Sequence, residues 1–299
     1  MDKEILRIFR ENPGNYMSGE QMSQNLGISR AALWKHIEKL RQKGYVFQAV
    51  PNLGYSLVCS PDRLFPEEVE SLSKNNVVGK KIIYYDIVDS TNRVCYELAE
   101  KGYPEGTVVV AEGQSKGRGR MRRQWISPKY AGIYFSVILK PDILPTQVPK
   151  ITLLSAVSIA LAIKRVTGLP ANIKWPNDIL VNRKKVCGIL TEMDAETDMV
   201  RFVVLGIGIN VNTDVLQLPP EASSLSKESD AEVSRIELLT EVLSQIETHY
   251  FKFQKQGFAS ITKEWENLSG ILGERIRVHL RGKETLAVSY THLRAHETV

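Results

Sequence analysis

The chain contains the stretch Gly117-Arg118-Gly119-Arg120-Met121-Arg122-Arg123-Gln124-Trp125, in which six of the nine residues are glycine or arginine. Glycine permits positive φ angles and lets backbone N–H groups approach an anion closely. Arginine keeps its charge, and its planar guanidinium matches carboxylate or phosphate oxygens. This stretch, called the Gly-Arg loop below, therefore predicts a binding loop for a small anion. A solvated surface loop and a nucleic-acid contact remain alternatives on these residues alone.

Strands on both sides of the Gly-Arg loop predict the fold class of the domain around it. Apolar, β-rich runs occur over Ile82–Ile87, Val108–Ala111, Ile133–Leu139, Val186–Met193 and Val200–Val211. Helical patterns separate some of these runs, but strand and helix do not alternate regularly. The sequence thus predicts an α+β domain with a mixed or largely antiparallel sheet.

Polar and glycine positions next to these strands predict a ligand pocket. Asp89-Ser90-Thr91-Asn92 precedes a helix, so its hydroxyl and amide groups either cap that helix or bind a ligand. Glycine within a strand often marks the close approach of a ligand or of another backbone. Three such glycines occur here, namely Gly188, Gly206 and Gly208. We expect them to form a slot that is open to a flat molecule.

The first sixty residues predict a winged helix-turn-helix. Apolar positions indicate three short helices, with Ser18 and Gln21 at the spacing of a capping box and Gly27 as a left-handed stop. Two short strands, 45–50 and 55–58, follow the third helix and complete the wing. The N-terminal end of a recognition helix meets base edges, and the DNA-contacting residues expected there are Ser29, Arg30, Ala31 and Lys35. A protein-interaction module stays open as an alternative, because the wing tip, 51–54, has no basic residue.

Composition restricts the broad class of protein. A chain of 299 residues with 43% hydrophobic residues can form one large core and one or two small domains. The formal net charge of +5 permits an anionic partner without requiring one. Three widely spaced cysteines make neither a disulfide framework nor a zinc site, which favours a cytoplasmic protein. No signal peptide is apparent, and the longest apolar run, 151–163, predicts a buried helix instead of a membrane span.

Four further motifs, taken together with the Gly-Arg loop, resemble those of a known protein family. They are Asp89-Ser90-Thr91-Asn92, Lys174-Trp175-Pro176-Asn177-Asp178, Lys185 with Gly188-Ile189-Leu190, and Gly206-Ile207-Gly208-Ile209-Asn210. With Gln114 and the loop, they resemble the biotin protein ligases, specifically the bifunctional kind with an N-terminal domain that represses biotin-synthesis genes. The resemblance covers roughly residues 3–280 and implies a class II synthetase-like ligase domain.

The resemblance also implies an activity and its partners. The family joins biotin to ATP, which gives biotinyl-5'-AMP and pyrophosphate, and then transfers biotin to a lysine of a biotin carboxyl carrier protein. In the first step a carboxylate meets a phosphate, and both are negative, so cationic residues and Mg²⁺ are the expected catalysts. Operator DNA and a second copy of the chain in the adenylate-bound state are the other expected partners.

The matching positions carry over roles residue by residue. The catalytic residues expected from the resemblance are Lys185, Arg120 and Asp178. Those expected to bind biotin are Ser90, Thr91, Asn92, Gln114, Arg118, Gly119, Arg120, Lys185, Gly188, Gly206 and Gly208. Those expected to bind ATP are Arg120, Arg123, Trp125, Lys185 and Asn210, with the Trp125 ring against adenine. The resemblance implies no metal site formed by the protein alone.

The chain departs from the family at two places. Arg122 stands where many relatives carry a smaller residue, often glycine. Past Gly273 we expect two strands of an incomplete small β-barrel, followed by a non-native tail, 289–299, that looks like translated adapter sequence. His292 and His296 in that tail lack a third ligand, so we expect no metal there. The expected division is a winged helix in 1–60, a ligase domain in 61–270, a partial barrel in 271–288 and the tail.

Two other functions remain open from the sequence. A DNA-binding biotin sensor without ligase activity would need the pocket but not an adenylation centre, and Lys185 and Arg120 argue against it. A lipoate-type ligase shares the fold and the chemistry. The Gly-Arg loop and the N-terminal helix-turn-helix argue against that second alternative.

Overall fold

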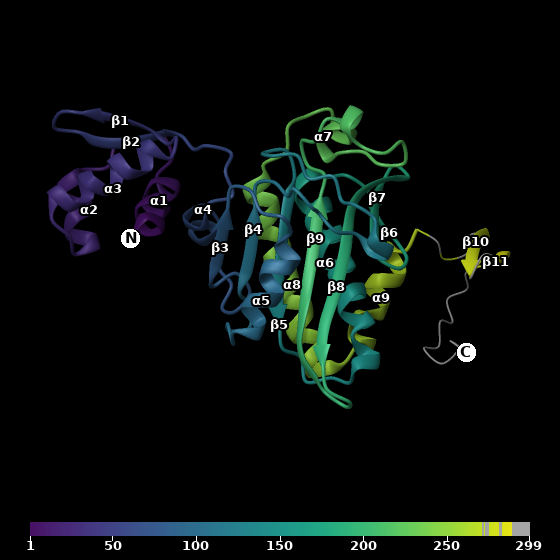
Figure 1. The fold of residues 1–299 in the computed structure, drawn as a ribbon. Helices are drawn as coiled ribbons and strands as arrows, with labels where there is room; N and C mark the ends of the chain where they lie inside the picture. Colours follow the sequence, from purple (N-terminus) through teal and green to yellow (C-terminus); the bar gives the residue numbers. More distant parts are fainter. Residues whose placement is uncertain (271, 273–274, 281–282, 289–299) are drawn as a thin grey trace.

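A computed structural model describes residues 1–270, 272, 275–280 and 283–288 of the chain. Three helices and a hairpin form the N-terminal unit (Figure 1). Their bounds are α1 Asp2–Glu11, α2 Gly19–Leu26, α3 Arg30–Gln42, β1 Val46–Val50 and β2 Gly54–Cys59. The two strands pair antiparallel. The predicted winged helix-turn-helix is confirmed.

The winged helix owes its shape to one apolar cluster and two helix ends. Ile5, Leu33 and Ile37 are completely or almost completely buried within this cluster. Gly27 has a φ of 64° and ends α2, as its lack of a Cβ permits. The Ser29 hydroxyl accepts a hydrogen bond from the backbone N–H of Ala32 at 3.1 Å and so begins α3. The capping box expected at Ser18 is wrong, because its side chain makes no capping hydrogen bond.

A seven-stranded sheet forms the centre of the molecule. Its spatial order is β3-β4-β5-β9-β8-β7-β6, in which β3 and β4 are parallel and the other neighbours are antiparallel. The bounds are β3 Ile82–Tyr85, β4 Val108–Ala111, β5 Ile133–Leu139, β6 Ala171–Lys174, β7 Asp178–Val181, β8 Lys184–Ala195 and β9 Val200–Ile209. The expected α+β class with a mixed, largely antiparallel sheet is therefore confirmed.

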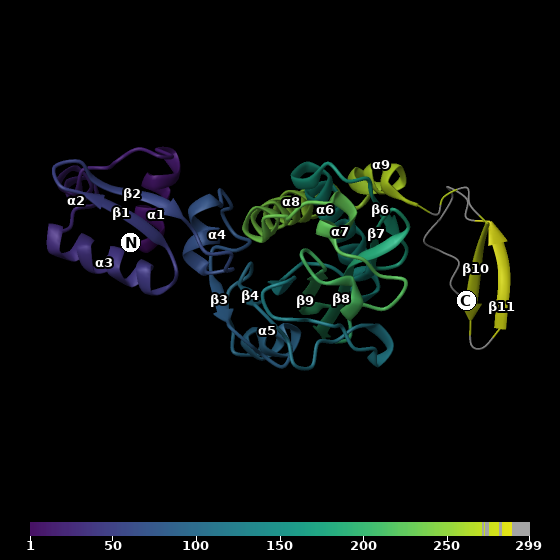
Figure 2. The same ribbon diagram turned by 90° about the horizontal axis from the view of Figure 1, so that it is seen from above.

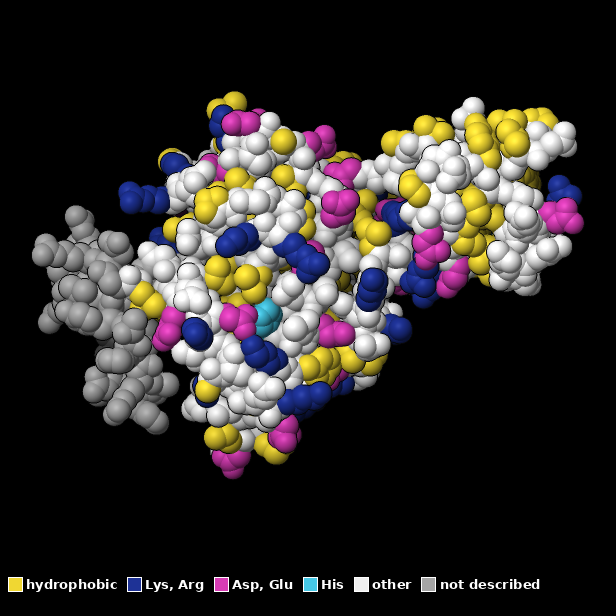
Figure 3. All heavy atoms as spheres, turned by 180° about the vertical axis from the view of Figure 1, so that it is seen from behind, with side chains coloured by type: hydrophobic (Ala, Val, Ile, Leu, Met, Phe, Trp, Pro, Cys, Tyr) yellow, Lys and Arg dark blue, Asp and Glu magenta, His cyan; other side chains and the backbone are white. Residues whose placement is uncertain are grey.

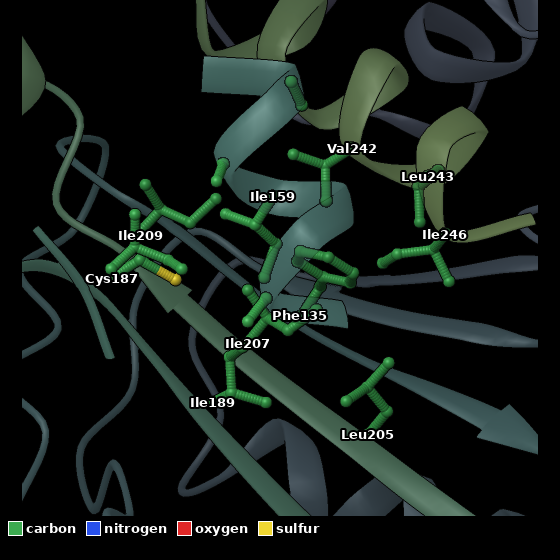
Figure 4. Close-up of a cluster of buried hydrophobic side chains, with 14 of the residues drawn as sticks. Phe135, Ile159, Cys187, Ile189, Leu205, Ile207, Ile209, Val242, Leu243 and Ile246 are labelled. Carbon is green, nitrogen blue, oxygen red and sulfur yellow. The ribbon is translucent and has the colours of Figure 1, made fainter. Parts of the chain in front are cut away.

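Helices cover both faces of this sheet (Figure 2). One face packs against α6 Pro149–Thr167, α8 Arg235–Gln256 and α9 Ala259–Leu268, and the close-up in Figure 4 shows Phe135 and Ile207 of the sheet beside Ile159 and Val242 of these helices. The other face packs against α5 Thr91–Glu100. Burial on both sides explains why β4 is wholly apolar and β5 is apolar apart from Ser136, instead of alternating between apolar and polar residues.

α6 is the buried helix that the apolar run predicted. Together with the turn before it, it is long and apolar enough to cross a membrane by length and composition alone. Its leucines, isoleucines and alanines instead form a large part of the core beneath the sheet. Figure 3, seen from behind, shows acidic and basic side chains interspersed over the outer surface on this side.

Short elements complete the description. α4 Pro66–Leu72 follows the winged helix and contacts both α1 and α8, and α7 Leu225–Ser229 precedes α8. The strands β10 Arg275–Leu280 and β11 Lys283–Val288 form a separate antiparallel pair, as expected for part of a small barrel. The tail 289–299, with His292 and His296, lies outside the described residues.

Candidate active site

A cavity of about 480 Å³ opens between the Gly-Arg loop, the N-terminus of α5 and the strands β8 and β9. The turn between β6 and β7 forms another part of its wall. Every residue predicted for the biotin or ATP site lines this cavity, namely Ser90, Thr91, Asn92, Gln114, Arg118, Gly119, Arg120, Arg123, Trp125, Asp178, Lys185, Gly188, Gly206, Gly208 and Asn210. The structure thus brings the whole predicted set together, while the role of each residue remains a prediction.

A chain of hydrogen bonds fixes the polar floor of the cavity. The side-chain carbonyl of Gln114 accepts from the backbone N–H of Thr91 at 2.8 Å, and the Gln114 amide donates to Ser127 at 3.0 Å. The Ser136 hydroxyl lies 2.9 Å from Thr91 Oγ1 and 2.6 Å from Asn92 Oδ1. Ser136 and Ser127 were not predicted. A lone serine inside the apolar strand β5 was the available signal for Ser136.

Asn92 fills the part of the predicted slot that lies over Gly206. Its amide donates to a Glu192 carboxylate oxygen at 2.8 Å, which orients the side chain. A Cβ placed on Gly206 would overlap Asn92 Oδ1, so only glycine allows the asparagine to lie there. The expectation of an open slot at Gly206 is therefore wrong, because a side chain of the protein occupies that space.

Trp125 fills the rest of the slot. A Cβ placed on Gly188 would lie 2.8 Å from the Trp125 ring, and one placed on Gly208 would overlap the indole nitrogen. The three glycines do mark close approach to the sheet, but the approaching groups are the Asn92 and Trp125 side chains. The Trp125 indole N–H is buried and has no hydrogen-bond partner among the described atoms. Such a group destabilises the state that contains it by about 1–3 kcal/mol.

The charged groups of the site lie around Lys185. Its ammonium is 2.7 Å from Asp178 Oδ1 and 5.2 Å from the centre of the Trp125 ring. Arg120 donates to the side-chain carbonyl of Asn177 at 3.2 Å. The backbone fixes the position of Lys185, because its N–H donates to Glu221 and its C=O accepts from Ser223, each at 2.9 Å.

The Gly-Arg loop carries more positive charge than its surroundings neutralise. Arg118 lies 3.8 Å from a Glu192 carboxylate oxygen, whereas Arg120, Arg122 and Arg123 have no carboxylate within 4.0 Å among the described residues. Met121 and Arg122 have φ angles of 54° and 60°, in the left-handed region that favours glycine. A glycine in place of Arg122 would relieve strain at that position.

Two pKa shifts describe the surroundings of the site. The hydrogen bond from Arg93 is the largest cause that lowers the pKa of Asp89, so this carboxylate stays ionised and accepts from the backbone N–H of Ser90 at 2.7 Å. Burial raises the pKa of the Cys187 thiol in β8. Cys187 is 0% exposed in the core cluster, so it packs there as a neutral thiol.

The predicted DNA-contacting residues share the outer face of α3. Arg30, Ala31 and Lys35 are exposed, and no carboxylate lies within 4.0 Å of either cation among the described residues. The Ser29 hydroxyl accepts from the Ala32 N–H to cap α3 and keeps its own O–H as a donor, so its contact with DNA stays a prediction. Lys39 on the same helix is paired with Asp2 at 2.9 Å.

Comparison with known proteins gives matches along most of the chain. Residues 84–210 match the biotin/lipoate A/B protein ligase family, and residues 2–56 match an HTH domain family. The bifunctional ligase/repressor BirA of Bacillus subtilis (strain 168) is 42% identical over 279 residues, which cover 92% of this chain and 86% of that protein. The bifunctional ligase/repressor BirA of Escherichia coli (strain K12) is 28% identical, with 92% and 85% covered.

A solved structure resembles a large part of this fold. The biotin protein ligase from Aquifex aeolicus in complex with biotin and ATP aligns with a TM-score of 0.60 at 31% identity. The alignment covers 70% of this chain and 86% of that chain.

Proposed function

This chain belongs to the family of biotin protein ligases, and from that premise we propose that it is both an enzyme and a transcriptional repressor. It is an ATP-dependent ligase that forms biotinyl-5'-AMP and transfers biotin to a lysine of a biotin carboxyl carrier protein. It also binds operator DNA as a repressor of biotin-synthesis genes. The observation that carries the proposal is that one cavity contains the Gly-Arg loop, the Lys185–Asp178 pair and the three glycines of β8 and β9. These glycines, Gly188, Gly206 and Gly208, are called the glycine floor below.

Each chemical step has a group in this cavity that suits it. In the first step a biotin carboxylate oxygen attacks the α-phosphorus of ATP, and pyrophosphate leaves. Lys185 and Arg120 stabilise the negative charge that gathers at this junction, because fixed cations in a site shielded from water act strongly. Gln114 and Thr91 offer hydrogen-bonding groups to the ureido ring of biotin, and Trp125 offers an apolar face to adenine.

The second step uses the same pocket. The amine of a carrier lysine attacks the biotinyl carbonyl, AMP leaves, and the amine loses a proton. Asp178 is positioned to orient that amine, since its carboxylate already holds an ammonium group, that of Lys185, at 2.7 Å. Closure of the Gly-Arg loop over the adenylate would exclude water from a mixed anhydride that hydrolyses readily.

Mg²⁺ enters this proposal with the nucleotide. Within the described residues no group of three or more His, Cys, Asp or Glu side chains is placed to hold a metal ion. Asp178 and Glu221 supply carboxylates in the cavity lining, which suits an ion held mainly by triphosphate oxygens and one or two side chains. When bound, the ion would neutralise part of the triphosphate charge.

Labelled biotin tests the enzyme directly. We expect incorporation into an added carrier domain that requires ATP, together with release of pyrophosphate. A protein that binds biotin but releases no pyrophosphate would instead be the sensor considered above. Competition between biotin and lipoate for the pocket separates the biotin ligase from the lipoate-type alternative.

Arg30→Ala tests the repressor function. We expect operator affinity to fall by about 1–3 kcal/mol if Arg30 contacts a base, or the salt dependence of binding to weaken by about one charge if it contacts phosphate. Gel-shift titrations at several salt concentrations measure both. Biotinylation of the carrier should be unchanged, because α3 lies outside the cavity. Unaltered operator binding by the variant would remove Arg30 from the interface.

Trp125→Phe tests whether ligand and indole compete for the glycine floor. Biotin that occupies Gly188 and Gly208 must displace the Trp125 ring, so tryptophan fluorescence should change on addition of biotin. The protein has four tryptophans, and the change should largely disappear in Trp125→Phe. An equal fluorescence change in both proteins would show that the indole stays in place.

The remaining expectations are part of the same proposal. Adenylate binding promotes a homodimer, which places two winged helices on one operator. The protein acts in the cytoplasm, where its three free cysteines stay reduced. The functional division is a DNA-binding unit in 1–60, a ligase domain in 61–270 and a partial barrel in 271–288.

A further inference from the structure

The segment 61–65 that joins the winged helix to the sheet domain is fixed by buried hydrogen bonds. Arg235, which is 0% exposed, donates to the Asp62 carboxylate at 2.7 Å and to the Asp62 backbone carbonyl at 2.5 Å. The backbone N–H of Leu64 donates to Glu112 Oε1 at 2.8 Å. Glu112 is also 0% exposed and accepts from Arg235 at 2.8 Å. The segment is therefore a fixed part of the structure and not a flexible tether.

Arg63 in this segment contacts both ends of the β4–β5 connection, 112–132, which contains the Gly-Arg loop. At the first end its Nε donates to Glu112 Oε1 at 3.2 Å. At the second end its guanidinium lies 4.2 Å from the centre of the Tyr130 ring. The guanidinium also donates to Asp86 at 2.7 Å, and Asp86 accepts from the Tyr130 hydroxyl at 2.9 Å.

The two ends of the connection also meet each other. The backbone N–H of Tyr130 donates to the Glu112 carbonyl at 3.1 Å. Two residues beyond Glu112 lies Gln114, whose side chain contacts Thr91 in the cavity floor. A change in the Gly-Arg loop that shifts either end therefore changes contacts of Arg63. The planar guanidinium can serve both ends at once, whereas a single ammonium cannot.

The winged helix is attached to the far side of the same segment through α4. Arg10 of α1 pairs with Glu68, which is 0% exposed, and Lys43 pairs with Glu67. Lys3 lies 3.4 Å from Glu70. Three acidic residues on one short helix thus bind three cations of the DNA-binding unit. The Phe65 ring, at the start of α4, links the two sides, because Lys43 Nζ lies 5.3 Å and the Arg63 guanidinium 5.1 Å from its centre. Contacts therefore continue from the winged helix through Phe65 and Arg63 to both ends of the β4–β5 connection.

We propose that Arg63 is a positioning residue that couples occupancy of the ligand cavity to the placement of the winged helix. The proposal rests on the proposed ligase and repressor functions and names the side chain that links them. Linkage makes the effect reciprocal: if ligand binding favours one placement of the winged helix, that placement favours ligand binding to the same degree. Arg63 touches neither the cavity nor the DNA-binding face of α3, so it acts only through the groups it holds.

Arg63→Ala tests this coupling in the full chain. Two quantities are measured, namely KM and kcat for biotin in pyrophosphate release, and operator affinity with and without biotin and ATP. We expect KM for biotin to rise by about 3- to 30-fold with kcat within about twofold. We expect the gain in operator affinity produced by biotin and ATP to shrink by a similar factor, while ligand-free affinity stays unchanged. Arg63→Lys should recover only part of either effect.

Arg165→Ala is the matched control. Arg165 also forms an ion pair with a carboxylate, that of Glu241 at 3.1 Å, but it lies between α6 and α8 and touches neither the segment nor the loop. Arg165→Ala should leave unchanged both KM for biotin and the gain in operator affinity that biotin and ATP produce. Asp86→Asn is a second variant for the case that Arg63→Ala does not fold. Asp86 is about half exposed at 48%, accepts from Arg63, and is joined to the second end by the hydrogen bond from the Tyr130 hydroxyl.

Asp86→Asn should shift the same two quantities in the same direction as Arg63→Ala. The proposal is overturned if either folded variant keeps both KM for biotin and the ligand-dependent gain within twofold of the wild type. It is equally overturned if Arg63→Ala lowers kcat and thermal stability only. A wild-type protein that neither biotinylates nor binds operator would instead contradict the proposed function, and the same assays detect that failure before any variant is compared.

Discussion

Lys185→Ala should lower the rate of biotinyl-adenylate formation by about 10²- to 10³-fold, as removal of one preorganised charge-stabilising group does elsewhere. The backbone of Lys185 is held in place by hydrogen bonds to the backbone of Glu221 and Ser223. Its ammonium lies between the Asp178 carboxylate and the Trp125 ring, in the wall of the cavity. Pyrophosphate release in the presence of biotin and ATP measures the effect.

The variant should remain folded, because the Lys185 side chain is partly exposed and packs little apolar surface. Lys184→Ala is a matched control on the neighbouring residue. The Lys184 ammonium is exposed and donates to the Pro220 carbonyl at 2.8 Å, away from Asp178. We therefore expect Lys184→Ala to form biotinyl-adenylate at the same rate as the unmodified protein. Equal activity of the two variants would exclude Lys185 from the adenylation chemistry.

Arg235→Met should reduce the free energy of unfolding by about 3–5 kcal/mol, the typical cost of removing one partner of a buried ion pair. Burial by itself lowers the pKa of Arg235, but the hydrogen bond to Asp62 and the attraction of Glu112 outweigh it, and the net shift is upward. The substitution leaves the Glu112 carboxylate buried without its 2.8 Å partner. Denaturant unfolding followed by far-UV circular dichroism measures the loss.

A double variant separates charge burial from lost packing. Arg235→Met combined with Glu112→Gln removes both charges and keeps a side-chain oxygen that can accept from the Leu64 N–H, so it should be more stable than Arg235→Met alone. Arg165→Met, which removes an exposed ion pair, should change stability by no more than about 1 kcal/mol. If the double variant is no more stable than the single one, the buried Glu112 charge left without Arg235 is not the source of the destabilisation.

The sequence predicted the elements of the fold because local patterns determine them. Gly27 ends α2 through interactions within a few residues, and it was identified as a helix stop from residue type and position. The apolar runs of β5 and β9 predicted buried strands for the same reason. Ser18 shows the limit of such patterns, since the right residues stand at capping-box spacing without forming the hydrogen bond.

The membership of the site was predicted from motifs, but its internal contacts were not. Trp125 was predicted as a site residue by its place in the Gly-Arg loop, and it lines the cavity. That its ring lies on Gly188 and Gly208 depends on how the loop folds back over the sheet, which no local pattern specifies. Arg235 and Glu112 are 123 residues apart in sequence, and only the packing of α8 against the sheet domain brings them together.

The position of Trp125 has a consequence for how any affinity of this pocket is to be understood. Because the indole already rests on the glycine floor, a vitamin molecule or an inhibitor there exchanges places with a resident group and does not enter empty space. The measured free energy of binding is then the difference between the interactions of the ligand with this surface and those of the indole that it displaces. A compound that leaves the ring seated and binds beside it would escape that competition, and would recognise the empty enzyme in preference to the loaded one.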